Sequence, residues 1–348
     1  MDFSIPELDK ELLARGARLT PDEQPSFNGI PGTPARENIM AQIEELYLPE
    51  NAPLPNDALS HVTLWQLAEA LFLKIREEEH KKALRGEGLR LDMYEISDPH
   101  IQRNARAVAS IWMKENVKNT GNNLFALQYQ PYGKSFNLCL CEPYYHQPIV
   151  AGRLCTGFLI KPDVIATAGH CADEKNVKNL CFVFGYEMKQ ADYPVTQVPD
   201  RDIYHGVEIL QRVYNPMGNG TDWALVKLDR NVSNRETLSL ATTDIHPSQG
   251  VYVLGYPSGL PLKYIPEEPV NTMKETFFSA ELSVYSGNSG SPVFCKDSHQ
   301  VVGIVVRGDQ QDFRWTGKGW MSIRYPNSMI KSNAPQCTKV SQFLSFCR

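Results

Sequence analysis

The stretch CTGFLIKPDVIATAGHC, residues 155–171, contains two short β-rich apolar runs, 158–160 and 164–168, on either side of a Pro-Asp pair. Short β-rich runs separated by turn residues are typical of an all-β sandwich or barrel. Further runs of this kind, with Gly, Pro, Asn and Asp between them, occur at 181–186, 223–228, 251–256, 291–294 and 301–306. We therefore expect a mainly β domain over residues 98–348.

Residues 1–97 have a different pattern, which predicts helices. Apolar residues recur at helical spacing between Ile39 and Tyr47, and again between Leu64 and Ile75. Residues 1–97 contain 18 acidic and 10 basic side chains, a net charge of −8, whereas residues 98–348 contain 22 and 25, a net charge of +3. This asymmetry indicates two units, a small α-helical N-terminal domain at 1–97 and the mainly β domain at 98–348.

Composition and charge narrow the class of protein. A chain of 348 residues that is 42% hydrophobic can bury a sizeable core. A net charge of −5, without a dense Lys/Arg stripe, argues against a nucleic-acid partner. No apolar run is long enough to cross a bilayer, so we expect no membrane association.

The expected location is cytoplasmic. The start MDFSIPELDKELL lacks the positively charged leader and apolar stretch of a secretory signal peptide. The eight cysteines, an even number, favour an oxidising compartment instead. A secreted or periplasmic protein whose signal peptide was removed is therefore the alternative.

Three segments contain residues suited to nucleophilic catalysis: TAGHC at 167–171, TDWAL at 221–225 and GNSGSP at 287–292. Each alone has an ordinary structural explanation. Together they supply what peptide-bond hydrolysis by serine needs: a hydroxyl, a base, a carboxylate that orients the base, and backbone N–H donors for the oxyanion. Glycines beside the serine let the chain turn tightly enough to aim two N–H groups at one point.

These segments resemble a known family. TAGHC and GNSGSP resemble the histidine and serine signatures of trypsin-like peptidases, and TDWALVKL resembles their aspartate segment, in the same His-Asp-Ser order. The stretches CEPYYHQP, GYPSGLPLK and YSGNSGSPVF look like a bacterial branch related to the glutamyl endopeptidases. The resemblance covers about residues 98–348. It implies a chymotrypsin-like double β-barrel.

The resemblance also implies a role for each matching residue. Ser289 would attack the scissile carbonyl of a protein or peptide substrate. His170 would carry its proton to the leaving amine, and Asp222 would orient the histidine. The N–H groups of Gly287 and Ser289 would form the oxyanion hole. This chemistry needs no metal and no organic cofactor.

Four positions are candidates for binding the substrate side chain. Ser283 stands where trypsin has the acidic residue that binds Arg or Lys. Val284 and Val305 stand where glutamyl endopeptidases have the Thr and His that recognise glutamate. We therefore expect a neutral pocket, with Arg307 as a group that would attract an acidic side chain. Asn288 replaces the aspartate of trypsin-like zymogens, so activation through an ion pair with a new N-terminus is not expected.

Cysteine spacing gives a further expectation. Cys155 lies sixteen residues before Cys171, as do the paired cysteines around the catalytic histidine in this family, which implies a disulfide. Cys337 with Cys347, and Cys181 with Cys295, are further possible pairs, since sequence does not fix connectivity.

The sequence thus predicts a serine endopeptidase whose residues 1–97 inhibit it, recruit its substrate or bind a regulatory protein. Two alternatives stay open. One is a protease-like binding module that has lost catalysis, and the other is an esterase that uses the same triad. A silent module would have a broken triad or a blocked oxyanion loop, and the sequence contains neither.

Overall fold

The computed structural model describes residues 90–138, 142–152, 155–191, 193–215, 221–308, 313–315, 320–322 and 334–347. The helices predicted within residues 1–89 lie outside this part of the chain. No helix in the described part is both apolar and long enough to cross a membrane. The chain divides into two compact units, one holding the β-barrels and one holding residues 131–147 and 313–323.

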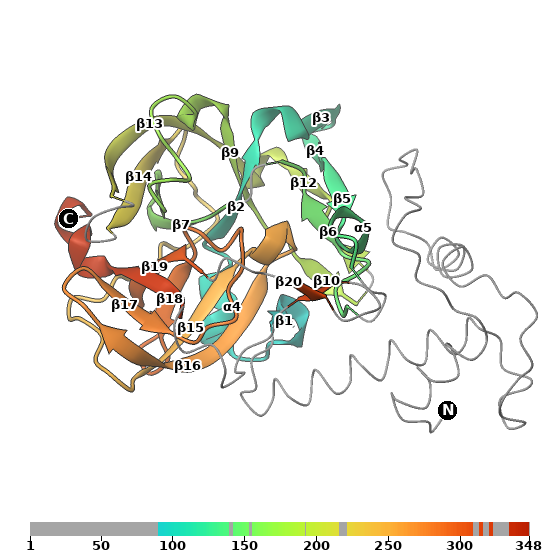
Figure 1. The fold of residues 1–348 in the computed structure, drawn as a ribbon. Helices are drawn as coiled ribbons and strands as arrows, with labels where there is room; N and C mark the ends of the chain where they lie inside the picture. The colour runs from blue at the N-terminus through green and yellow to red at the C-terminus, as the bar shows by residue number, and fades with distance from the viewer. Residues whose placement is uncertain are drawn as a thin grey trace, which may run out of the picture. The chain divides into compact units, whose positions relative to one another are not determined.

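The first barrel consists of six antiparallel strands in the closed order β13-β14-β8-β7-β2-β9 (Figure 1). The pairing of Ile203 with Val183, between β13 and β9, closes the ring. The bounds are β2 (Val108–Met113), β7 (Cys155–Lys161), β8 (Val164–Thr167), β9 (Leu180–Phe184), β13 (Ile203–Tyr214) and β14 (Asp222–Leu228).

The second barrel has the order β16-β15-β18-β19-β22-β17, and β17 pairs back onto β16 through Val270 and Ala280. Its bounds are β15 (Gly250–Gly255), β16 (Lys263–Met273), β17 (Phe277–Ala280), β18 (Pro292–Cys295), β19 (Val301–Arg307) and β22 (Gln336–Lys339). Two six-stranded barrels confirm the predicted chymotrypsin-like fold.

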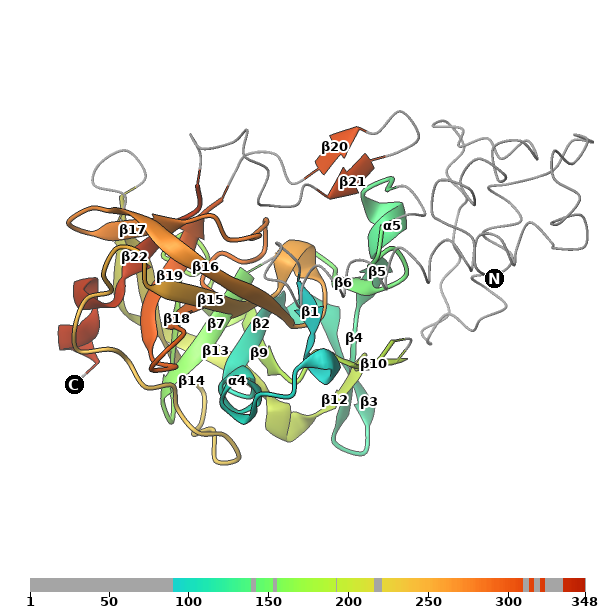
Figure 2. The same ribbon diagram turned by 90° about the horizontal axis from the view of Figure 1, so that it is seen from below.

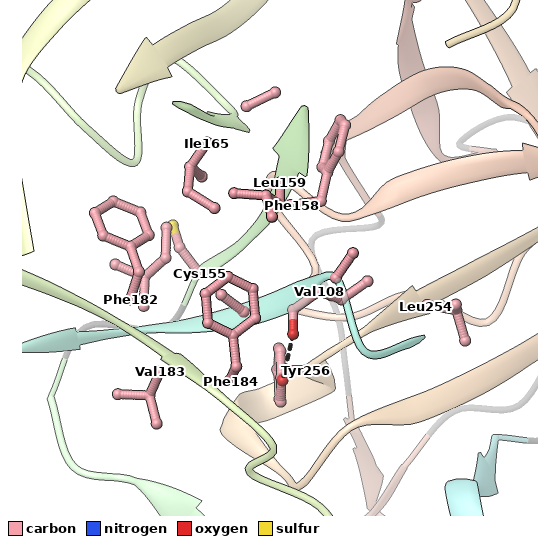
Figure 3. Close-up of a cluster of buried hydrophobic side chains, with 14 of the residues drawn as sticks. Val108, Cys155, Phe158, Leu159, Ile165, Phe182, Val183, Phe184, Leu254 and Tyr256 are labelled. Carbon is pink, nitrogen blue, oxygen red and sulfur yellow. Dashed lines mark hydrogen bonds between the residues drawn. The ribbon is translucent and has the colours of Figure 1, made fainter. Parts of the chain in front are cut away.

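A continuous apolar core joins the two barrels (Figure 3). Strand β2 is buried over nearly its whole length because other elements cover both of its faces. Phe158 and Phe184 of the first barrel are fully buried, and Tyr256, just after β15, belongs to the same cluster. The Tyr256 hydroxyl donates a hydrogen bond to the Val108 carbonyl at 3.2 Å. This shared core fixes how loops of one barrel meet loops of the other.

A short strand precedes the barrels. Strand β1 (Leu91–Asp92) pairs with the long strand β16 and adds an edge to the second barrel (Figure 2). The 3₁₀ helix η2 (Met93–Glu95) and helix α4 (Pro99–Ala105) follow. The Asp98 side chain caps α4 by accepting the N–H groups of His100 and Ile101. The last residues of the predicted helical unit therefore form a strand and a 3₁₀ turn.

The other described elements are short. The barrel-containing unit has the strands β3 (Val117–Gly121), β4 (Leu124–Leu127), β6 (Pro148–Val150), β10 (Met188–Gln190), β11 (Tyr193–Pro194) and β12 (Gln197–Pro199), and the 3₁₀ helices η3 (Lys114–Asn116), η4 (Val177–Asn179), η5 (Asp200–Asp202), η6 (Pro257–Gly259), η7 (Val340–Gln342) and η8 (Leu344–Phe346). Strand β5 (Tyr129–Pro131) leads into the smaller unit, which has α5 (Tyr132–Ser135), β20 (Phe313–Trp315) and β21 (Trp320–Ser322).

Candidate active site

Asp222 is the first residue of β14 and only 1% of it is exposed. Its carboxylate accepts two hydrogen bonds from His170. The ring Nδ1 lies 2.7 Å from Oδ2, and the backbone N–H donates to Oδ1 at 3.1 Å. Because both bonds come from one residue, the carboxylate fixes the position and the orientation of the imidazole together.

His170 lies in the turn after β8, with its side chain 30% exposed. Two residues at the end of β13 flank this turn. The Arg212 Nε donates to the carbonyl of Gly169 at 2.6 Å, which holds the peptide unit joined to the histidine. The ring of Tyr214 lies 6.1 Å from the imidazole, at an interplanar angle of 51°. Arg212 thus fixes the backbone next to His170, and the Tyr214 ring flanks its imidazole.

The Ser289 loop comes from the second barrel, just before β18. Gly287 and Gly290 have φ angles of +95° and +87°, in the region that side chains other than glycine rarely adopt. The Asn288 N–H donates to the Tyr285 carbonyl at 2.9 Å, and the Gly290 N–H donates to the Val305 carbonyl at 2.7 Å. These bonds curl the loop tightly around the serine.

Thr156 of the first barrel binds this loop twice. Its N–H donates to the Ser289 carbonyl at 2.8 Å, and its hydroxyl donates to the Gly287 carbonyl, also at 2.8 Å. Among the hydrogen bonds of the described residues, none uses the N–H of Gly287 or of Ser289 as a donor. The clamp on two carbonyls therefore leaves the two N–H groups of the predicted oxyanion hole open to a ligand.

The same contact brings Ser289 to the histidine turn. A Cβ atom added to Gly290 would lie 2.0 Å from the Thr156 carbonyl oxygen and 2.3 Å from the Thr167 Oγ1. The sulfur of Cys171, the residue after the histidine, lies 3.7 Å from the Ser289 carbonyl oxygen. The structure thus gathers the predicted triad and oxyanion residues at the junction of the barrels.

The predicted disulfide is present. Cys155 and Cys171 are bonded, with their Cα atoms 6.1 Å apart. Their sulfurs lie close to a nitrogen of His170, but disulfide sulfurs are not thiolate ligands, so this group does not form a metal site.

The other two proposed cysteine pairs are wrong, because Cys181, Cys295, Cys337 and Cys347 carry free thiols. Cys181 lies on β9 of the first barrel with its sulfur 3.2 Å from the His205 Nδ1, whereas Cys295 lies on β18 of the second barrel. Burial raises the pKa of Cys181 to about 12. The Cys347 sulfur contacts the Phe343 carbonyl oxygen at 3.3 Å.

The predicted substrate-binding residues lie close to the Ser289 loop. Val305 exchanges backbone hydrogen bonds with this loop, accepting from Gly290 and donating to Ser291. Ser283, Val284 and Val305 are at most 3% exposed, and both valines belong to the second-barrel core. Arg307 is half-buried, and its Nη2 lies 3.4 Å from the carbonyl oxygen of Asn215.

Sequence reasoning missed Thr156, Arg212 and Tyr214. Thr156 acts through its backbone as much as its hydroxyl, and its partners are 131 and 133 residues away. Arg212 acts on a carbonyl 43 residues away. A motif of adjacent residues cannot reveal such contacts. Tyr214 pairs with Asp222 across the β13–β14 hairpin. Its place eight residues before Asp222 in the sequence is the signal that could have indicated a position near the histidine.

One stretch of the chain matches a known protein family. Residues 155–304 match the model of the trypsin-like peptidase domain, and this stretch contains all three predicted catalytic residues. The matched stretch is therefore similar to the trypsin-like peptidase domain.

Solved structures of proteases are also similar. A Glu endopeptidase determined in complex with MPD is 16% identical, with 75% of this chain and 96% of that chain covered and a TM-score of 0.44. The VesB protease of Vibrio cholerae is 15% identical, with 75% and 66% covered and a TM-score of 0.44. A search of curated proteins gave no match.

The disulfide predicts a measurable contribution to stability. Replacing both Cys155 and Cys171 by serine should lower the free energy of unfolding of the barrels by about 3 kcal/mol. The bond joins residues 16 positions apart, and closing a loop of this size in the unfolded chain has an effect of that order. Urea denaturation followed by tryptophan fluorescence measures the change. Cys347→Ser, which removes a free and half-buried thiol, is the control. A double variant as stable as this control would contradict the assignment.

Proposed function

We propose that the chain is a serine endopeptidase that uses Ser289, His170 and Asp222. The clamp by Thr156 supports this most strongly, because it binds the carbonyls of Gly287 and Ser289, while the N–H groups of the same two residues donate to no other described group. The buried Asp222 carboxylate supports it independently, because it binds both the backbone N–H and the ring Nδ1 of His170. Acyl transfer needs both arrangements together.

The protonation pattern follows from the hydrogen bonds. A carboxylate only accepts hydrogen bonds, so the His170 Nδ1 carries the proton that faces Asp222. The lone pair of Nε2 is then available to take the proton of the Ser289 hydroxyl. Asp222 stabilises the imidazolium that forms and keeps the tautomer correct for the next turnover.

The reaction then proceeds in two halves. The Ser289 Oγ bonds to the scissile carbonyl carbon, and the N–H groups of Gly287 and Ser289 stabilise the oxyanion. The carbon–nitrogen bond breaks, and the leaving amine takes the proton from His170. Water then attacks the acyl-enzyme, His170 accepts its proton, and that proton returns to Ser289 as the acid leaves.

A fluorophosphonate should label Ser289, because it bonds to an activated serine hydroxyl. Labelling should be absent in Ser289→Ala and much slower in His170→Ala, while Asp222→Asn should lower kcat by about 10⁴ because the histidine takes the wrong tautomer. Mass spectrometry of the labelled peptide measures the first two changes, and hydrolysis of a peptide anilide measures the third.

Labelling that persists unchanged in Ser289→Ala would refute the proposal. A folded wild-type protein that neither labels nor hydrolyses peptides would favour the silent binding module. Activity towards esters but not towards peptides or proteins would favour the esterase.

We further propose that the substrate side chain enters a neutral pocket formed by Ser283, Val284 and Val305. All three side chains are uncharged and almost fully buried beside the Ser289 loop. A buried ionic side chain without a counter-charge is costly. Uncharged side chains should therefore bind best on the acyl side of the scissile bond.

Peptides that differ only at that position test the pocket. Uncharged residues should be cleaved at least about ten-fold faster than Arg, Lys or Glu, a difference of about 1.4 kcal/mol. Ser283→Asp should raise the rate for Arg and Lys by supplying a counter-charge. A wild-type preference for Glu that disappears in Arg307→Ala would assign recognition to Arg307 and exclude a neutral pocket.

We also propose that residues 1–97 regulate the protease domain or recruit a protein to it. Their net charge of −8 is opposite in sign to the +3 of residues 98–348, and such complementarity favours encounter. The proposal leaves inhibition and recruitment as two distinct modes.

A variant that starts at Ala83 separates the two modes and keeps strand β1. Inhibition predicts faster cleavage of a small peptide by this variant. Recruitment predicts unchanged peptide cleavage but lost cleavage of the natural substrate protein. That protein can be found by comparing new termini in cells expressing wild type with those expressing Ser289→Ala. Stoichiometric fluorophosphonate labelling of the variant is the control for folding. Unchanged rates on both substrates would exclude both roles.

A further inference from the structure

Arg90, immediately before strand β1, has a buried charged side chain that packs on a tyrosine ring. The residue is 2% exposed, and its guanidinium carbon lies 4.0 Å from the centre of the Tyr285 ring. An arginine side chain keeps its charge when it is buried. The face of an aromatic ring attracts such a cation, most strongly where water is excluded. The contact therefore joins the residue that precedes β1 to the second barrel.

Tyr285 begins the turn that carries the oxyanion-binding N–H groups. The residue is 4% exposed, and its carbonyl accepts the Asn288 N–H at 2.9 Å. The next carbonyl, of Ser286, accepts the Ser258 N–H at 2.5 Å. Gly287 follows directly, so a shift of Tyr285 changes the direction of the Gly287 N–H.

The backbone on the other side of Arg90 is anchored as well. Leu91 and Asp92 pair with Tyr264 and Lys263 of β16. The Asp92 carboxylate forms an ion pair with the Lys263 ammonium, and both side chains are at least 99% buried. A buried ion pair of this kind is strongly destabilised by the loss of one partner. Arg90 thus reaches Tyr285 from a fixed strand.

We propose that Arg90 is a positioning residue for the Gly287–Ser289 loop. The proposal rests on the proposed function of Ser289. Arg90 holds the Tyr285 ring, Tyr285 holds the start of the turn, and the turn directs the two N–H groups. Truncation or proteolysis upstream of Arg90 then preserves the oxyanion site, whereas loss of Arg90 impairs it.

Kinetic measurements on Arg90 variants of the full-length protein test the contacts that link Arg90, Tyr285 and the turn. Arg90→Leu should lower kcat by about 10- to 100-fold with little change in KM, because a small misplacement of catalytic groups has effects of this size. Arg90→Lys should recover part of the loss, since an ammonium also binds over the ring. Affinity for a peptide boronate should fall in parallel with kcat/KM.

A matched control is available in the first barrel. The Arg230 guanidinium carbon lies 4.4 Å from the centre of the Tyr204 ring on β13, whereas β18 belongs to the other barrel. Arg230→Leu should leave kcat within about two-fold of wild type. An equal loss in Arg230→Leu and Arg90→Leu, or a normal kcat in Arg90→Leu, would overturn the proposal.

Hydrogen exchange separates this proposal from the catalytic one. In a Ser289→Ala background, adding Arg90→Leu should speed amide exchange in peptides spanning residues 283–291, whereas adding Arg230→Leu should not. Faster exchange in a protein whose wild type is inactive would support the positioning contact and refute the catalytic function. Unchanged exchange in a protein whose wild type is active would refute positioning alone.

Discussion

The two hydrogen bonds from Thr156 to the Ser289 loop are the constraint on which the site depends. They run from the first barrel to the carbonyls of Gly287 and Ser289 in the second. Neither barrel alone holds both the proposed base and the proposed nucleophile, since His170 and Asp222 come from the first and Ser289 from the second. The shared core around Tyr256 sets the distance between the barrels. The two Thr156 hydrogen bonds then fix the conformation of the Ser289 loop at that distance.

Glycine at two positions makes this contact possible. Gly290 passes so close to Thr156 and Thr167 that a larger residue would push the loop away. Gly287 adopts a positive φ, and a Cβ atom added to it would lie 2.5 Å from the Tyr256 carbonyl oxygen. The two glycines of GNSGSP are therefore needed for the barrels to pack closely, and not only for the chemistry of the serine.

The sequence predicted those features that depend on neighbouring residues in the chain. The short β-rich runs and the motif resemblance led to the double barrel, and the spacing of Cys155 and Cys171 led to the disulfide. The two further cysteine pairs were wrong, because barrel cores also bury single thiols such as Cys337. Contacts between distant residues were not predictable. Arg90 and Tyr285 are an example, since nothing in the sequence places β1 against β16.

The most direct test of the account is a crystal structure of the protein with a peptide boronate bound. The account predicts a covalent bond from boron to the Ser289 Oγ, with one boronate oxygen about 2.7–3.1 Å from the N–H groups of both Gly287 and Ser289. The His170 ring should remain bonded to Asp222. A boronate bonded to another residue, or an oxygen directed away from these two N–H groups, would contradict it.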